Sequence, residues 1–478
     1  MTGLWKRFKS HYLDNRLFYN VLFGWTVLFL GLRTIQHLSF QTNTYDLSIF
    51  DYMMHFTLHG EFMAEPFHGY WGSHFAIHFT PILLPILPFY FIFKGPLFLL
   101  YLQIFVGAVS AAVFYSILKK EWQKSPLSIL IAFSYLIYRP FLNGIMYDFH
   151  PEMFFPLIFF LAYYFLTLKK NHIFFFLFIS LALLIKEDVA VYLFFFGIFL
   201  FFRMKENRRI GLVTSVISLC YFLITMGIII PYFRERLGIG TAFEFSSLWQ
   251  GTSDNVFDII KSLATHPLSI LKTISWTTVF QGFFNIISPL LFIPFLSWFV
   301  ILIFPMLFIL ATSKSPIMQG FGLHYISSML PFLFLALSDG LKNLGRLIHE
   351  QKKSRKFLVY LAAAILLINL VNTRWNLLNP SRYSALKDYK TVKEYIRLIP
   401  PESSVAATSS LIPHIPKRRN IYMLPNSDDA EYILIHSGIN PWPLEKQQLE
   451  NLIGQFSESK KYLCLKSKGP LKLFKKVD

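Results

Sequence analysis

Long apolar runs recur along most of this chain, and short clusters of lysine and arginine separate them. A helix needs about 20 mainly apolar residues to cross the hydrocarbon core of a bilayer. Hydrophobic residues make up 54% of the sequence and charged residues 15%, whereas an average soluble domain contains about 25% charged residues. The sequence therefore predicts an all-α polytopic membrane protein.

We expect about 11 transmembrane helices, each near the length that a bilayer requires. Their bounds are roughly 17–38, 96–118, 126–142, 153–168, 172–186, 189–204, 209–232, 276–293, 295–312, 323–341 and 357–373. With the N-terminus in the cytoplasm, the basic clusters at 119–124, 169–172, 203–209 and 342–356 all lie on the cytoplasmic side, as the positive-inside rule expects. Because basic residues gather mostly in such short clusters, the net charge of +18 does not indicate a nucleic-acid partner.

One apolar segment, 76–93, is excluded from this set. Pro81, Pro85 and Pro88 each remove a helix hydrogen-bond donor and interrupt the segment. Counting it as a span would also place the later basic clusters outside the cell. We therefore expect 39–95 to be one large outer loop that carries helices lying along the membrane interface.

Two further regions are expected on the outer side. A second outer loop runs over 233–275 and contains Arg234 and Arg236. Because the number of spans is odd, the tail at 374–478 also lies outside. Its mixed composition, with the strand-like EYILIHSG beginning at Glu431, predicts a small soluble α/β domain.

The head of the first outer loop, TNTYDLSIFDYMMHFTLHG, is unusually polar for a membrane exit. Asp51, His55 and His59 recur every four residues, so a helix would align them on one face. Asp46 precedes that helix. It is either a helix cap or a functional acid, and the histidines are either part of a site or a wetted helix face.

The second polar cluster is YDFHPE at 147–152. In an extended chain, Asp148, His150 and Glu152 would project to one side and could bind a divalent metal or several hydroxyl groups. The alternative is structural. Pro151 suits the first turn of a helix, where Glu152 would favour the positive end of the helix dipole.

The third cluster is KEDVA at 186–190, which contains Lys186, Glu187 and Asp188. These residues form either a structural charge pair at the end of a span or a substrate-binding group in which the lysine holds a phosphate. His74 and His78 of the first outer loop are further candidates. The sequence contains no H-E-x-x-H motif or thiolate cluster for zinc, no nucleotide-binding loop and no G-x-S-x-G elbow.

The motifs YDLSIFD, HFTP, YDFHPE and KEDVA resemble those of a bacterial family of predicted membrane proteins. That family is similar to the GT-C superfamily of glycosyltransferases, which use polyprenyl-phosphate sugars. The resemblance covers residues 17–232 well. It continues more weakly through GLHYISSMLPFLF at 322–334, which contains His324, and through the tail at 403–425.

The resemblance implies a GT-C-like fold in the bacterial inner membrane. It also implies transfer of a sugar from a polyprenyl-phosphate donor to a glycan, lipid or protein acceptor. Asp46 matches the acid that serves as base or helps to bind metal, with Asp51 as the candidate second carboxylate because Leu47 follows Asp46. His78, Lys186, Glu187, Asp188 and His324 would bind substrate, and Asp148, His150 and Glu152 would bind a divalent cation, Mg²⁺ or Mn²⁺, if one is used.

Two other functions stay open at this point. A transporter or flippase for a lipid-linked or anionic substrate would place ionisable groups deep within its spans and often contains repeated halves. A non-catalytic protein could keep the same scaffold and bind a glycan lipid. No internal repeat is visible in the sequence, which counts against the transporter.

Overall fold

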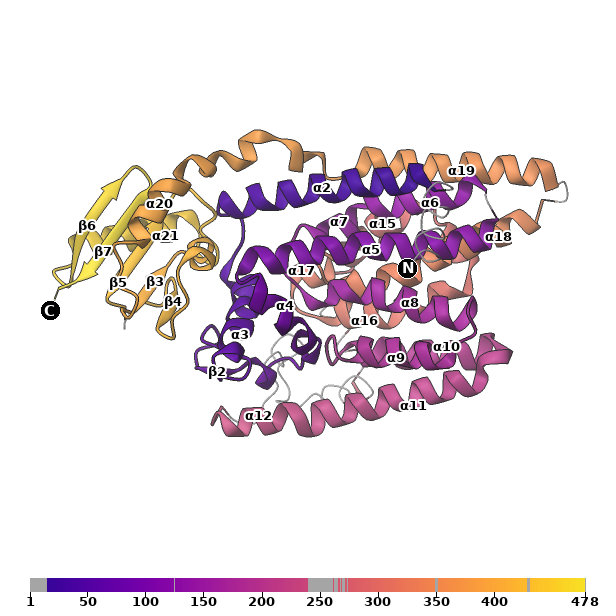
Figure 1. Cartoon of the computed structure of the whole chain (residues 1–478), viewed down its shortest axis with the longest axis horizontal. Coiled ribbons are helices and arrows are strands. Elements are labelled where there is room, and N and C mark those ends of the chain that lie inside the picture. Colours follow the sequence, from indigo (N-terminus) through magenta and orange to yellow (C-terminus); the bar gives the residue numbers. More distant parts are fainter. Residues whose placement is uncertain are drawn as a thin grey trace, which may run out of the picture.

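The computed structural model describes residues 15–123, 125–239, 261, 265–266, 268, 271–272, 274–348, 351–427 and 430–477. These residues form a helical bundle with a small β-sheet at one end (Figure 1). Four long helices run along the long axis of the molecule: α2 (Arg16–Leu38), α5 (Pro96–Trp122), α11 (Arg208–Ile224) and α19 (Gln351–Asn372). The other bundle helices are α6 (Pro126–Ile137), α7 (Arg139–Ile145), α8 (Phe155–Thr167), α9 (His172–Leu183), α10 (Val189–Arg203), α12 (Ile230–Arg236), α15 (Trp276–Ile287), α16 (Phe304–Thr312), α17 (Pro316–Gln319) and α18 (Leu330–Arg346).

Among the described residues, four segments are long and apolar enough to cross a membrane. They are Arg16–Leu38, Pro96–Trp122, Lys205–Arg236 and Lys353–Asn372. Helices α6 and α7 together add a fifth candidate that is bent by 50°. The remaining apolar helices are shorter, so the expected 11 spans and the GT-C fold stay predictions, while the prediction of a helical membrane protein agrees with the structure.

Prolines explain why the apolar run at 276–312 is divided differently from the two spans expected there. Helix α15 ends at Ile287, directly before Ser288 and Pro289. Leu291 and Phe292 then adopt positive φ angles of 53° and 58°, which turn the chain. Short 3₁₀ segments follow before α16 begins, because each proline removes a backbone donor that a continuous helix would need.

The two ends of the bundle differ in character. Helices α2 and α19 begin at the right-hand end in Figure 1, and α5 ends there. The described residues of the basic clusters at 119–124, 203–209 and 342–356 therefore lie toward one end. The first outer loop and the C-terminal sheet lie at the other end, as the positive-inside assignment requires. Which end faces the cytoplasm stays a prediction.

The first outer loop forms α3 (Ile49–Leu58), the two-residue strands β1 (Ala64–Glu65) and β2 (Gly72–Ser73), a 3₁₀ segment (Pro81–Ile86) and α4 (Leu87–Ile92). The prolines hold the apolar helical stretch Pro81–Ile92 well below the length of a span. Other apolar helices within the expected spans are also short, so the exclusion of 76–93 from the spans stays a prediction. Most of the second expected outer loop, 233–275, lies outside the described residues.

Helices α10 and α11 pack closely through small residues. A Cβ atom on Gly211 would lie 2.5 Å from the backbone oxygen of Gly197, and one on Gly197 would lie 2.3 Å from Oγ of Ser215. Small residues allow helix backbones in a membrane to approach one another and to gain van der Waals contact. This contact fixes the hairpin that follows Lys186.

The tail contains a five-stranded sheet in the order β4-β3-β5-β7-β6. The strands are β3 (Val405–Ala407), β4 (Ile421–Met423), β5 (Tyr432–His436), β6 (Tyr462–Lys468) and β7 (Leu471–Lys476), and the helices are α20 (Tyr389–Ile396) and α21 (Lys446–Glu458). Strand β3 is parallel to β4 and β5, while β7 is antiparallel to β5 and β6. The strand expected in EYILIHSG is β5, whose five residues are all buried.

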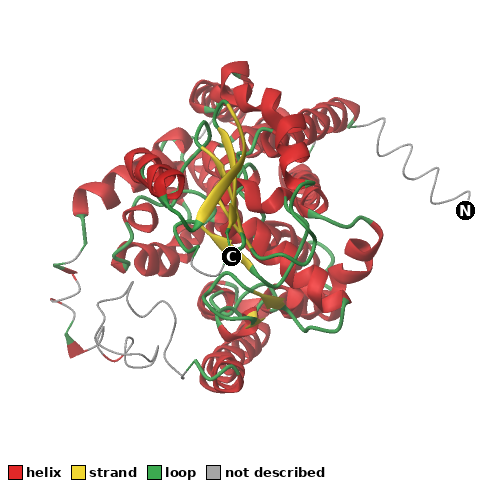
Figure 2. Ribbon diagram, turned by 90° about the vertical axis from the view of Figure 1, so that its left-hand side faces the viewer, coloured by secondary structure: helices red, strands yellow, loops and turns green. Residues whose placement is uncertain are grey.

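The C-terminal sheet lies across the end of the helix bundle (Figure 2). The backbone nitrogen and hydroxyl of Thr44 donate to Ser409, at 3.1 and 2.9 Å. The Lys417 ammonium lies 2.6 Å from the Asp51 carboxylate. The tail is therefore fastened to the segment that carries Asp46.

Candidate functional site

Asp46 lies between α2 and α3 in a strained backbone conformation. Its φ of 75° and ψ of −80° are near those of a γ-turn that non-glycine residues rarely adopt. Ser48 is the N-cap of α3, and no side chain caps that helix, so the cap interpretation of Asp46 is wrong. Strained residues persist where the surrounding structure holds them, and they gather at functional sites.

The carboxylate of Asp46 is held by His150. Oδ1 of Asp46 lies 3.1 Å from Nε2 of His150. The Asp46 side chain is 28% exposed, whereas the His150 side chain is 5% exposed. An accessible acid therefore stands in front of a buried imidazole.

The imidazole of His150 is fixed from several sides. Its Nδ1 donates to the backbone oxygen of Asp148 at 2.9 Å, since a carbonyl can only accept. Its backbone nitrogen donates to Oε1 of Gln103 at 2.8 Å. The ring of His324 stacks on it with a centroid separation of 3.4 Å, and the ring of Tyr147 lies near both histidines.

Asp46 and His150 shift the pKa values of one another. Burial by itself would raise the pKa of Asp46, but the charge and hydrogen bond of His150 lower it below its usual value. Burial would lower the pKa of His150, but Asp46 raises it above its usual value. Both shifts therefore favour the carboxylate–imidazolium form of the pair.

A second ion pair lies beside the first. The ammonium of Lys186 is 2.9 Å from Oε1 of Glu152, and both side chains are mostly buried. Asp46 and Glu152 both act electrostatically on His324. The structure thus brings together five of the residues singled out in the sequence, which form the Asp46 cluster: Asp46, His150, Glu152, Lys186 and His324.

Asp148 faces a different partner. Its carboxylate lies 3.6 Å from the fully buried guanidinium of Arg33 in α2 and accepts the backbone N–H of Asn43 at 2.9 Å. Burial raises the pKa of Asp148 to about 6, although Arg33 opposes that shift. Asp148 therefore anchors the 147–152 segment to the first helix.

The metal group expected from Asp148, His150 and Glu152 does not form. The three side chains contact three different partners. A 3₁₀ turn begins at Pro151, so the chain is not extended through Glu152 and the alternate side chains do not all project to one side. In the part of the chain that the structure describes, the group of possible ligands that does gather is Glu65, His68 and His74.

The other charges of KEDVA each have a separate contact. The carboxylate of Glu187 lies 2.6 Å from Nδ1 of His78 and accepts the backbone N–H of Phe79 at 3.0 Å. Asp188 accepts from the hydroxyl of Tyr192 at 3.1 Å. Glu187 thus fastens the first outer loop to the turn before α10, next to Lys186. A substrate-binding role for His78, Glu187 or Asp188 stays a prediction.

Asp51 does not join Asp46 as a second exposed acid. Its side chain is buried, where it accepts from the hydroxyl of Tyr90 and pairs with Lys417. His59 lies at the surface of the same loop, with its ring 4.3 Å from that of His55. The helical face that was expected to align these residues is thus buried at Asp51 and exposed at His59.

Two residues that shape the site, Arg33 and Gln103, were missed in the sequence. Both lie within expected spans, where a polar side chain is costly and is a functional candidate by default. That signal could have identified them. Lys417 carried no comparable signal, because a lysine in a basic tail is usually solvated.

Comparison with known families gives a match over most of the chain. The family model described as "Predicted membrane protein (DUF2079)" matches residues 36–469. The chain belongs to this family. The range of the DUF2079 match includes the whole Asp46 cluster and most of the C-terminal sheet. Comparison with curated proteins gives no match.

Proposed function

We propose that this DUF2079 member is an integral-membrane glycosyltransferase. It would transfer a sugar from a polyprenyl-phosphate donor to an acceptor hydroxyl on the extracytoplasmic face. The observation that carries this proposal is the Asp46 carboxylate, which is accessible, ionised and held 3.1 Å from a buried imidazole at one end of a membrane bundle.

Asp46 would act as the general base. The acceptor oxygen attacks the anomeric carbon, and the carboxylate takes the hydroxyl proton. His150 positions that carboxylate and keeps it ionised. A carboxylate is a weak base, which is sufficient where bond breaking runs ahead of proton transfer and the sugar gains oxocarbenium character.

Lys186 would stabilise the leaving group. As the new bond to the acceptor oxygen forms, the bond between the anomeric carbon and the phosphate oxygen breaks, and the phosphate leaves with the electron pair. Glu152 holds the ammonium of Lys186, which has three N–H donors. A lysine placed in this way can offset the negative charge that develops on the departing phosphate.

An apolar pocket of about 450 Å³ supports a lipid donor. Its lining residues come from the first outer loop and the α11–α12 segment: Phe62, Phe75, Phe79, Pro81, Leu84, Ile228, Ile229, Tyr232 and Phe233. Phe79 follows His78, which contacts Glu187, the neighbour of Lys186. A prenyl chain in this pocket would therefore contact a segment that is bound to Glu187, the residue next to Lys186.

Purified protein in lipid vesicles, given radiolabelled polyprenyl-phosphate sugars and candidate acceptors, tests the proposal. The variant Asp46→Asn should lower acceptor-dependent transfer by about 10²- to 10⁴-fold, the usual contribution of a general base. The matched control is Glu206→Gln, an exposed acid near the α10–α11 turn. Equal transfer by Asp46→Asn would refute the role of Asp46. Label that crosses the vesicle membrane without transfer would indicate a transporter instead.

A further inference from the structure

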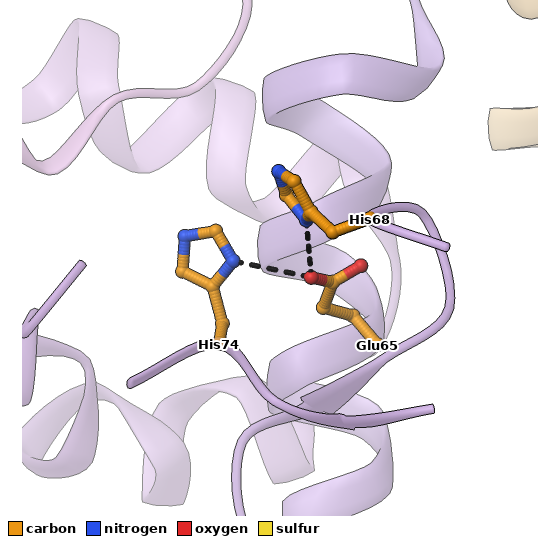
Figure 3. A group of neighbouring side chains, drawn as sticks. All are labelled: Glu65, His68 and His74. Atoms are coloured by element: carbon orange, nitrogen blue, oxygen red, sulfur yellow. Dashed lines mark hydrogen bonds and ion pairs between the residues drawn. The ribbon is translucent and has the colours of Figure 1, made fainter. Parts of the chain in front are cut away.

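The first outer loop gathers one carboxylate and two imidazoles that the Asp46 cluster does not use (Figure 3). Glu65 ends β1, and His74 directly follows β2, the antiparallel partner of that strand. Oε1 of Glu65 lies 2.5 Å from Nδ1 of His68 and 3.3 Å from Nδ1 of His74. Each ring thus directs its Nδ1 atom toward Oε1 of Glu65.

This group is withdrawn from solvent. The side chains of Glu65 and His74 are 0% and 4% exposed, and that of His68 is 13% exposed. The second oxygen of Glu65 accepts the backbone N–H of Phe67 at 2.6 Å, which fixes the carboxylate. A buried, oriented carboxylate with two imidazoles in one short loop differs from the exposed acidic clusters that are common on protein surfaces.

We infer that Glu65, His68 and His74 bind a transition-metal ion of the Zn²⁺ type. Their ligand atoms lie within 4.8 Å of one another. Two imidazoles and one carboxylate are a frequent ligand set for zinc, and a water would take the fourth position. This inference does not depend on glycosyl transfer.

The geometry requires only a small adjustment. Zinc bonds of about 2.1 Å in a tetrahedron place neighbouring ligand atoms about 3.4 Å apart. The separation between Glu65 and His74 already meets this value, and His68 must withdraw from the carboxylate by about 1 Å. Each ring that is neutral must carry its proton on Nε2 so that Nδ1 can bind the metal.

The position of the group indicates what the ion would do. The ring of Tyr45, the residue before Asp46, lies 5.9 Å from the ring of His68. The ring of Phe50 lies 6.1 Å from that of His74 and 6.2 Å from that of His150. A metal here would brace the backbone that carries Asp46.

Zinc binding by the full-length protein in detergent tests this assignment. The protein is stripped with a chelator, equilibrated with Zn²⁺, desalted and assayed for bound metal, and its thermal unfolding is recorded with and without the ion. Wild type should retain one Zn²⁺ per chain and unfold at a higher temperature with it. His68→Gln and His74→Gln should each weaken binding at least tenfold and lose the thermal shift.

Two controls keep the result specific. His172→Gln, at the start of α9, should bind Zn²⁺ as the wild type does. His59→Gln tests whether the exposed pair His55 and His59 holds the metal instead. No retained zinc in wild type, unchanged binding in both ligand variants, or loss of zinc in His59→Gln would each overturn the assignment. If a histidine variant fails to fold, Glu65→Gln, which keeps the side-chain volume, tests the same site: it should also weaken zinc binding and lose the thermal shift.

Discussion

The Asp46 carboxylate lies 3.1 Å from Nε2 of His150, and the two residues come from different loops of the bundle. One member is accessible and the other is buried. Each shifts the pKa of the other toward its charged form. They therefore form one electrostatic unit, and the stability of the protein should depend on pH through both.

The variant His150→Gln should reveal this pH dependence. Because Asp46 raises the pKa of His150, the stabilisation is complete below about pH 6.5 and is lost as pH rises through the folded pKa. Because the pKa of Asp46 is lowered, its contribution is present above about pH 4 and is lost on further acidification. The difference in melting temperature between wild type and variant should be largest between these limits. A difference that stays constant from pH 5 to about pH 9 would contradict the pair.

The Lys186–Glu152 pair should behave as a coupled unit. Lys186→Met leaves the carboxylate of Glu152 mostly buried without its partner, which should cost about 3 kcal/mol in the free energy of unfolding. The double variant Lys186→Met with Glu152→Gln should recover at least about 1 kcal/mol of that loss. Denaturant unfolding of the four proteins in a double-mutant cycle measures the coupling. Strictly additive effects would show that the two side chains do not interact.

Two basic residues of the tail should contribute unequally to its attachment. Lys417 is 15% exposed and pairs with buried Asp51, whereas Arg419 is 62% exposed and pairs with Glu61. Lys417→Met should therefore destabilise by about 3 kcal/mol, and Arg419→Met by at most about 1 kcal/mol. Hydrogen exchange of α3 should rise in the first variant and stay nearly unchanged in the second. The reverse order would contradict the attachment of the tail through Lys417 and Asp51.

Gly211 should tolerate no side chain. A Cβ atom there would meet the backbone of α10, so Gly211→Ala should cost about 1 to 3 kcal/mol. Gly24→Ala in α2 is the matched control, because nothing lies within 4 Å of its added Cβ. Thermal unfolding in detergent measures both. Equal melting temperatures would show that α10 and α11 are less closely packed.

The local features of this protein follow from the sequence. The apolar runs predict a helical membrane protein, and membership of the DUF2079 family of predicted membrane proteins agrees with that prediction. Three prolines predict the interruption of 76–93, and the apolar EYILIHSG predicts a buried strand. These signals are local, because backbone donors and apolar runs act within one helix or strand.

The partners of the polar side chains were decided only by the tertiary structure. Asp148, His150 and Glu152 alternate in sequence, yet they contact Arg33, Asp46 and Lys186. Glu65, His68 and His74 follow no metal-binding motif, and the pairing of β1 with β2 brings Glu65 and His74 together. A buried charge must find a partner, but which partner it finds depends on how the helices pack and therefore on contacts far apart in the chain.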